Sequence, residues 1–165
     1  MDYNTAYYKS KLGILSIGYD DSCITHIQIN KSDITLSESI SSPLSDSAFK
    51  QIEEYLNGMR FDFTFPFALE GTDFQIMIWD ILLNIPYGET TSFYSIACKV
   101  GNPSYARAVG NAIHANNLLF VIPCHRVIGK NGNLAGYVAG MEVKKFLLDL
   151  EHKNLSKSKQ IIKSI

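Results

Sequence analysis

The order of apolar and polar residues predicts a small sheet near the start of the chain. Apolar and polar residues alternate in three short segments, 3–9, 14–19 and 23–29, which Gly13 and the polar run 20–22 separate. Alternation with a period of two is typical of half-buried strands, and short connections favour antiparallel neighbours. The pattern therefore predicts three antiparallel strands.

Helical spacing follows this sheet. Between Ser45 and Asn57 the apolar positions recur every three or four residues, and Gly58 marks the end of the helix. The residues predicted to face inward are Ala48, Phe49, Ile52, Tyr55 and Leu56. The Phe-rich segment 61–69 is interrupted by Pro66, which predicts an edge strand or a linker rather than a central strand.

A second group of helices is predicted beyond residue 70. Thr72 and Gln75 have the spacing of a capping box, which predicts a helix start. The buried stripe of this helix is predicted to hold Phe74, Ile78, Ile81, Leu82 and Ile85. The region is therefore expected to be mainly helical.

Residues 91–113 have the pattern of a helix-turn-helix. Thr91 and Ser92 can cap a first helix over 93–100, and Gly101-Asn102-Pro103 would end it. Pro103 suits the first turn of a second helix, Ser104 to Ile113. That helix carries the small residues Ala106, Ala108, Gly110 and Ala112 and the cation Arg107. Such a low surface could approach a nucleic-acid groove, although small residues also favour tight packing between helices.

Charge is divided unevenly between the two regions. The chain has 165 residues and a net charge of -1, but residues 1–70 hold five Lys/Arg and ten Asp/Glu, whereas 71–165 hold ten and six. The basic half is therefore the half with the helix-turn-helix pattern, as expected where phosphate contacts supply affinity. Part of the excess lies in Lys153, Lys157, Lys159 and Lys163, to which we assign no function.

Composition and targeting signals indicate a cytoplasmic protein. No apolar run is long enough to span a bilayer, and the start Met1-Asp2-Tyr3-Asn4 lacks the features of a signal peptide, so we expect no membrane association. The three cysteines, at positions 23, 98 and 124, form no disulfide framework and suit a reducing compartment. Cys23 and His26 alone are too few ligands for zinc, so we expect no metal and no other cofactor.

The run Ile122-Pro123-Cys124-His125-Arg126 is the strongest candidate for chemistry. A free thiol is only slightly ionised at neutral pH unless a cation or hydrogen-bond donor stabilises the thiolate, and His125 and Arg126 could supply that. Pro123 places the thiol at a break in the chain. Adjacent side chains rarely face each other, so His125 is expected to reach Cys124 through a bend or a water. The alternative is a buried, inert cysteine in a strand.

From Gly71 to Glu151 the chain closely resembles the 6-O-methylguanine-DNA methyltransferases. The matching pieces are Gly71-Thr72-Asp73-Phe74-Gln75, Trp79, Ile85-Pro86-Tyr87-Gly88-Glu89-Thr90, Arg107-Ala108-Val109-Gly110-Asn111, Asn116, Pro123-Cys124-His125-Arg126, Gly136-Tyr137, Lys144, Leu147-Leu148 and Glu151. Several ordered motifs make the resemblance specific. The first seventy residues are similar to the family's variable N-terminal domain only in outline.

The resemblance implies an α+β fold with three parts. Residues 1–70 would form a small ribonuclease H-like lobe with an antiparallel sheet. Residues 71–152 would form a helical, winged helix-turn-helix-like alkyltransferase domain that binds DNA, and 153–165 a basic tail. The implied partner is double-stranded DNA containing alkylated guanine, and we expect a monomer.

The resemblance also implies roles for individual residues. Cys124 would accept the alkyl group irreversibly, His125 would act as its base through a water, and Glu151 would orient the imidazole. Asn116 would brace the turn between the second helix and the strand that carries Cys124. Without the resemblance, an exposed helical carboxylate is the expected state of Glu151.

Further implied roles concern the base and the DNA. Tyr137 would donate its hydroxyl to the guanine ring, and the main-chain N–H of Val138 would contact the 6-oxygen. Arg107 would fill the gap left by an extruded nucleotide. Ala106, Ala108 and Gly110 would let the second helix enter the minor groove.

Departures from the family pattern affect the expected rate. Phe93 stands where family members usually have a tyrosine that helps to turn the phosphate of the target nucleotide. Because Phe93 lacks that hydroxyl, turning the nucleotide would depend on steric contact or on Tyr94. Val138 replaces a serine or small residue, Asn117 replaces a proline, and Tyr105 adds bulk near the second helix. The thiol, its base and its acid are all retained, so activity is expected.

Three other classes of protein share some of these features. An alkyltransferase-like lesion binder has the fold but lacks the cysteine. A winged-helix regulator would explain the helix pair and the turn at Gly132, but would not need Cys124, His125 and Glu151. A cysteine hydrolase could use the same three residues but would turn over repeatedly, whereas a stable thioether permits one reaction per molecule.

Overall fold

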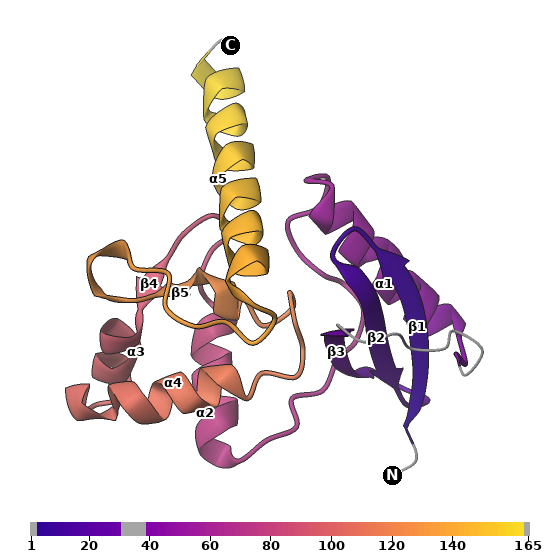
Figure 1. Ribbon diagram of the computed structural model, residues 1–165, viewed down its shortest axis with the longest axis horizontal. Helices are drawn as coiled ribbons and strands as arrows, with labels where there is room; N and C mark the ends of the chain where they lie inside the picture. Colours follow the sequence, from indigo (N-terminus) through magenta and orange to yellow (C-terminus); the bar gives the residue numbers. More distant parts are fainter. Residues whose placement is uncertain (1–2, 31–38, 164–165) are drawn as a thin grey trace. The chain divides into compact units, whose positions relative to one another are not determined.

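The computed structural model describes residues 3–30 and 39–163, with side chains described up to residue 157 (Figure 1). The expected tail side chains Lys159 and Lys163, and the start Met1-Asp2, lie outside this described part. The chain forms two compact units. One contains the residues up to Thr72 together with Asn117–Val121, and the other contains Asp73–Asn116 and the residues from Ile122 onward.

The first unit is built on a three-stranded antiparallel sheet, as predicted. Its strands are β1 (Asn4–Ser10), β2 (Gly13–Tyr19) and β3 (Ile24–Asn30), in the order β1-β2-β3. Gly13 has φ +116°, a conformation that a tight connection requires and that glycine adopts without steric cost. Alternate residues of β2 and β3, among them Leu15, Ile17 and Ile27, are fully buried.

Helix α1 (Pro43–Leu56) packs on this sheet (Figure 1). It begins two residues earlier than predicted, because Ser42 and Ser45 form a reciprocal capping box and Pro43 occupies the first turn. Ile52, Tyr55 and Leu56 are buried as predicted. Phe49 is only half-buried, and its ring stacks on Tyr8 with the centroids 4.4 Å apart.

Two segments from outside the sheet lie along β3. Phe67 forms a parallel bridge with Ile24, so 61–69 is a linker with one strand-like contact. Asn117–Val121, which we had assigned to the second domain, also lies here. The N–H of Ile27 donates to the Asn117 carbonyl at 2.7 Å, and the N–H of Leu119 donates to the Ile27 carbonyl at 3.1 Å. Free backbone groups at a sheet edge explain this placement.

The second unit is mainly helical. Its elements, in chain order, are α2 (Asp73–Leu83), β4 (Thr91–Ser92), α3 (Phe93–Lys99), η2 (Pro103–Tyr105), α4 (Ala106–His114), η3 (Cys124–Arg126), β5 (Val127–Ile128), η4 (Lys130–Gly132) and α5 (Met141–Lys163). The short strands β4 and β5 pair in parallel. On α2, Ile78, Trp79 and Leu82 are buried, while Phe74 and Ile81 are only half-buried.

The predicted helix-turn-helix is present, with one correction. Ser92 caps α3 by accepting from the N–H of Ser95 at 3.0 Å. The second α-helix begins at Ala106 rather than Ser104, because Pro103 opens the 3₁₀ turn η2 instead. Ala112 is buried, and its carbonyl accepts from Trp79 Nε1 at 2.9 Å, so it is not part of a surface for DNA.

Helix α5 extends through residues that were predicted as a tail. It runs from Met141 to Lys163, and the side chains of 152–157 are exposed or half-buried (Figure 1). Among the helices of the described part, none has both the length and the apolar content needed to cross a bilayer.

Candidate active site

A tight turn presents Cys124 at the start of η3. Pro123 has φ -78° and ψ 58°, and the N–H of Cys124 donates to the Ile122 carbonyl at 2.7 Å. These values define an inverse γ-turn, which proline favours because its ring fixes φ. Cys124 therefore lies at the junction of this γ-turn and the 3₁₀ turn η3. It was predicted to lie in a strand, but that strand, β5, begins only at Val127.

Asn116 braces this turn from inside the protein. Its Nδ2 donates to the Ile122 carbonyl at 3.1 Å and to Cys124 Sγ at 3.0 Å. Asn116 is 4% exposed, so water does not compete for either contact. The amide thus fixes the backbone before the thiol and also stabilises negative charge on the sulfur.

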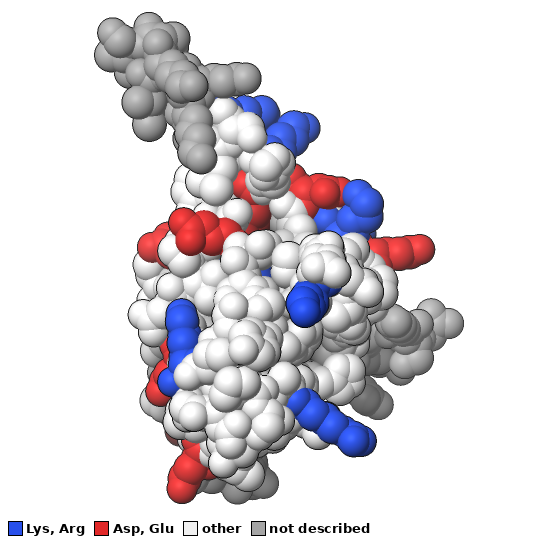
Figure 2. Space-filling view, turned by 90° about the vertical axis from the view of Figure 1, so that its left-hand side faces the viewer, with Lys and Arg blue, Asp and Glu red and all other residues white. Residues whose placement is uncertain are grey.

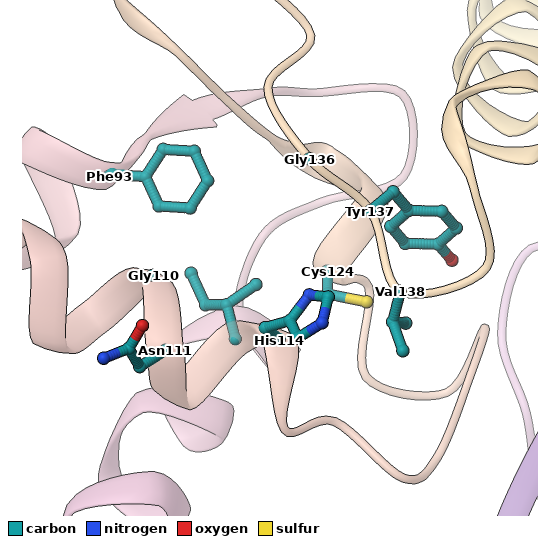
Figure 3. A pocket seen from close by; sticks show the side chains of 9 residues that line it. Phe93, Gly110, Asn111, His114, Cys124, Gly136, Tyr137 and Val138 are labelled. Carbon is teal, nitrogen blue, oxygen red and sulfur yellow. The ribbon is translucent and has the colours of Figure 1, made fainter.

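A pocket of about 290 Å³ opens beside the sulfur (Figure 3). Its lining residues are Phe93, Gly110, Asn111, Ile113, His114, Cys124, Gly136, Tyr137 and Val138. Helix α4 contributes one wall, and the segment 136–138 contributes the opposite wall. The pocket brings together the predicted nucleophile and the two residues predicted to contact the base, Tyr137 and Val138.

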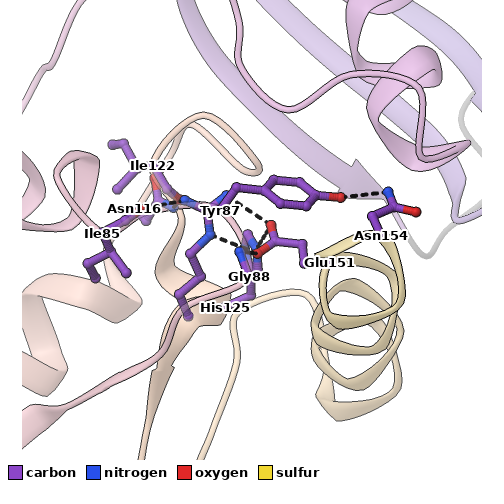
Figure 4. Close-up of polar contacts among 9 residues, drawn as sticks. Ile85, Tyr87, Gly88, Asn116, Ile122, His125, Glu151 and Asn154 are labelled. Carbon is purple, nitrogen blue, oxygen red and sulfur yellow. Dashed lines mark hydrogen bonds and ion pairs between the residues drawn. The ribbon is translucent and has the colours of Figure 1, made fainter. Parts of the chain in front are cut away.

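Behind Cys124, Glu151 is the centre of a buried polar cluster (Figure 4). Its Oε1 accepts from His125 Nε2 at 2.8 Å and from Arg126 Nη2 at 2.9 Å. Its Oε2 accepts from Arg126 Nε at 2.9 Å and from the N–H of Gly88 at 2.8 Å. Glu151 and His125 are both 0% exposed, so the exposed state considered for Glu151 is wrong.

The cluster keeps Glu151 ionised. Burial alone would raise the pKa of its carboxyl, but the hydrogen bonds and charges of His125 and Arg126 outweigh burial and lower that pKa to about 2. Burial lowers the pKa of His125, against the opposite influence of Glu151. At neutral pH the site therefore holds a carboxylate, a guanidinium and an uncharged imidazole.

Cys124 is a thiol in this resting state. Its side chain is 2% exposed, and burial raises its pKa above the ordinary value. Hydrogen bonds from Asn116 and Tyr137 and the positive charge of Lys144 oppose this effect but do not cancel it. A reaction at the sulfur therefore needs a group that removes its proton, and the uncharged imidazole of His125 is the next side chain along the chain.

Lys144 is a buried cation near the thiol. It is 1% exposed, and its Nζ donates to the Val127 carbonyl at 2.6 Å and to the Gly136 carbonyl at 3.4 Å. Burial lowers its pKa to about 8. No position near Cys124 was predicted for Lys144, because nothing local in the sequence indicates that these two residues converge.

The residues predicted to bind DNA lie around the mouth of the pocket. Arg107 and Ala108 are exposed on α4, Ala106 is half-buried, and Gly110 lines the pocket. Phe93 lines this pocket and also a second one with Ser92, Tyr94, Ala106 and Lys130. Figure 2 shows that this side of the molecule is largely uncharged, with basic side chains standing apart.

Two features of the site differ from the sequence analysis. Arg126 was expected to act on the thiol, but it turns to Glu151 and to the Ile85 carbonyl, to which its Nη1 donates at 2.6 Å. Its direction follows from its position in a 3₁₀ turn, where neighbouring side chains diverge. His114 was not predicted, although its spacing of four residues from Gly110 could have placed it on the same helix face.

No metal-binding group is formed by the residues that the structure describes. No set of three or more His, Cys, Asp or Glu side chains among them could hold an ion. Cys23 instead lies near Asp20, with Sγ 3.6 Å from Oδ2.

Comparison with known proteins identifies similar sequences for both units. Residues 73–153 match the family described as "6-O-methylguanine DNA methyltransferase, DNA binding domain", and residues 4–69 match "6-O-methylguanine DNA methyltransferase, ribonuclease-like domain". The constitutive methylated-DNA–protein-cysteine methyltransferase of Bacillus subtilis is 40% identical over 157 residues, which cover 90% of this chain and 94% of that protein.

Other relatives match over different lengths. The inducible methylated-DNA–protein-cysteine methyltransferase of Bacillus subtilis is 52% identical over 101 residues, which are 61% of this chain and 56% of that protein. The crystal structure of Mycobacterium tuberculosis O6-methylguanine methyltransferase has a TM-score of 0.82 and 35% identity, and covers 93% of this chain and 94% of that one. A structure of the same mycobacterial protein in complex with DNA also has a TM-score of 0.82, with 36% identity over 92% of this chain and 94% of that one.

Proposed function

Because the chain belongs to the 6-O-methylguanine DNA methyltransferase family, we propose that it repairs duplex DNA by moving an alkyl group from the 6-oxygen of guanine to Cys124. The single observation that supports this most directly is the thiol itself. Cys124 Sγ faces a pocket and is backed by Asn116 and by the His125–Glu151 pair. A lesion binder of the same fold would not need that arrangement, and would lack the sulfur.

The reaction exchanges one bond at the alkyl carbon for another. Sγ forms a bond to that carbon as the bond from carbon to the guanine 6-oxygen breaks, and the electrons of the broken bond stay on the base. The proton of the thiol passes to His125, through a water, and a proton returns to the guanine ring. Atoms and charge then balance, because the products are a thioether and neutral guanine.

His125 is suited to this role by its two ring nitrogens. Nε2 donates to Glu151, so the other nitrogen of the neutral ring, Nδ1, can accept a proton. The Glu151 carboxylate then stabilises the imidazolium that forms. Nothing in the site removes an alkyl group from a thioether, so each molecule reacts once.

We place the guanine in the pocket between α4 and residues 136–138. In this arrangement Tyr137 donates from its hydroxyl to the base, and the main-chain N–H of Val138 faces the 6-oxygen. A base can reach this pocket only after it leaves the duplex, which costs a few kcal/mol. The exposed Arg107 fills the gap, and the small residues Ala108 and Gly110 admit α4 to the minor groove.

Transfer of a labelled methyl group tests this function. The protein is mixed with duplex DNA that carries a labelled methyl group on the guanine 6-oxygen, and the label on the protein is counted and located by mass spectrometry. We expect one label per molecule, on Cys124, and no transfer by C124A, which still binds the DNA. Label released as methanol would indicate a hydrolase, and transfer by C124A would exclude the assignment.

A further inference from the structure

Arg126 binds the buried carboxylate of Glu151 through two of its three guanidinium nitrogens. Its Nε and Nη2 each donate to a different oxygen of Glu151, both at 2.9 Å, which is the two-bond geometry that a guanidinium shares with a carboxylate. The third nitrogen, Nη1, donates to the Ile85 carbonyl at 2.6 Å. All three nitrogens are therefore engaged.

The turn 86–89, whose Tyr87 ring lies beside the Arg126 guanidinium, contacts α5. The Arg126 guanidinium carbon lies 5.5 Å from the centre of the Tyr87 ring, and the Tyr87 hydroxyl accepts from Asn154 Nδ2 at 2.9 Å (Figure 4). Gly88 has φ +76°, and a Cβ at that position would lie 2.2 Å from Leu155 Cδ1. This turn is thus seated closely on the helix that carries Glu151.

The balance of charge around His125 follows from this geometry. Among the described residues, the charged groups that act on His125 include Glu151 and Lys144 of α5 and Arg126 of η3, and the thiol of Cys124 is its neighbour in the chain. The Arg126 guanidinium lies against both carboxylate oxygens, so its positive charge offsets the negative charge of Glu151 at His125. A protonated His125 would therefore add an uncompensated positive charge to a fully buried site, where Lys144 already repels it.

We propose that Arg126 is a positioning residue for alkyl transfer, which neutralises Glu151 and thereby keeps His125 an uncharged base that is ready to accept the Cys124 proton. This inference rests on the proposed function. Glu151 stabilises the imidazolium of His125 once the thiol proton has been transferred. Before that transfer, Arg126 shares the charge of Glu151, so the imidazole stays neutral. A lysine could supply the charge but not the two parallel bonds.

The test measures single-turnover methyl transfer by the full chain between about pH 5 and 9, together with the NMR titration of His125 in ¹⁵N-labelled protein. In R126Q the carboxylate is no longer neutralised and favours the imidazolium. We expect the His125 titration and the acid limb of the rate profile to move to higher pH by about one unit or more. On that limb, a shift of one unit lowers the rate about tenfold at a given pH. R126K should recover much of this shift but less of the maximum rate.

Matched controls separate this role from a structural one. Arg60 pairs with Glu54 at 2.7 Å in the first unit, where both side chains are partly exposed, so R60Q removes an ion pair away from the site and should leave both measurements unchanged. A rate that R126Q lowers equally at every pH, with the His125 titration unmoved, would overturn the proposal. Should R126Q not fold, the wild-type titration decides, since a His125 that is already protonated at pH 7 also overturns it.

Failure of the proposed function would look different. Wild-type protein would then transfer no methyl group to Cys124 at any pH, which removes any role of Arg126 in transfer. An unmoved His125 titration in R126Q, with wild-type transfer intact, rejects the Arg126 proposal alone.

Discussion

Asn116 Nδ2 lies 3.0 Å from Cys124 Sγ and donates at the same time to the carbonyl of Ile122, two residues before the thiol. One buried amide thus fixes both the turn and the sulfur that the turn presents. The contact is also a hydrogen bond that strengthens when the sulfur becomes negatively charged. Asn116 therefore links the local backbone geometry to the ionisation of the thiol.

Replacement of Asn116 by alanine should slow transfer and destabilise the fold. The Ile122 carbonyl loses its buried donor, which costs about 1–3 kcal/mol, and the pKa of Cys124 rises further without the Nδ2 contact. Urea unfolding and the single-turnover rate at neutral pH measure the two effects. Asn84 is a suitable control, because its Nδ2 also donates to a carbonyl, that of Asp80 at 2.8 Å, but in an exposed position. N84A should change neither quantity appreciably, and an N116A rate equal to wild type would contradict the assignment.

Acid should destabilise the protein through Glu151. The pKa of its carboxyl is about 2 in the folded state, whereas its ordinary value is 4.5. Ionisation of Glu151 therefore stabilises the folded state above pH 4.5. This contribution is lost as the pH falls from 4.5 toward 2. The difference corresponds to about 3 kcal/mol. In E151Q the free energy of unfolding should fall at neutral pH, because Arg126 loses its partner, and should depend less on pH between 4.5 and 2. An unchanged dependence on pH in E151Q would contradict the expectation.

Gly110 offers a variant in which stability and activity should change in opposite directions. A Cβ at this position would meet only the Phe93 ring, at 3.8 Å, which is an ordinary contact. Alanine is favoured over glycine inside a helix by about 0.5–1 kcal/mol, so G110A should raise the thermal stability. The added methyl group would narrow the pocket beside Cys124 and thicken α4, and should slow transfer from duplex DNA more than transfer from free 6-O-methylguanine. Equal rates for wild type and G110A on duplex DNA would argue against entry of the base past α4.

Arg107 tests the extrusion of the nucleotide. Its side chain is exposed, so R107A should leave the stability within about 0.5 kcal/mol of wild type. Transfer from duplex DNA at saturating protein should fall, whereas transfer from the free base should not change. Lys99, exposed in the last turn of α3, is the control for charge alone. K99A should weaken DNA binding and reduce the salt dependence of that binding, but should keep the transfer rate at saturating protein. The same result for R107A would show that Arg107 contributes only charge.

Much of the fold could be predicted because periodicity and turn residues act locally. Alternation predicted the sheet, and Ser92 capped α3 as expected. Local patterns failed where a non-local contact decided the outcome. Asn117–Val121 joined the first unit because β3 offered backbone groups at its edge, and Pro103 opened a 3₁₀ turn before α4 began.

The site shows the same division. Cys124 and His125 are neighbours in the sequence, so their chemistry could be suspected from composition alone. Glu151 lies 26 residues from His125 and was connected to it only through the resemblance to a family. Arg126 was assigned to the wrong partner, and Lys144 and His114 were given no role, because sequence order does not say which side chains converge.

By itself, the sequence determined which groups were available to react and which segments would be helical or extended, since both depend on side-chain type and short-range spacing. Tertiary structure alone decided the ionisation of those groups. Whether Cys124 is a thiol, His125 neutral and Glu151 charged depends on burial and on partners that the fold brings from distant positions, and these electrostatic effects act through space rather than along the chain.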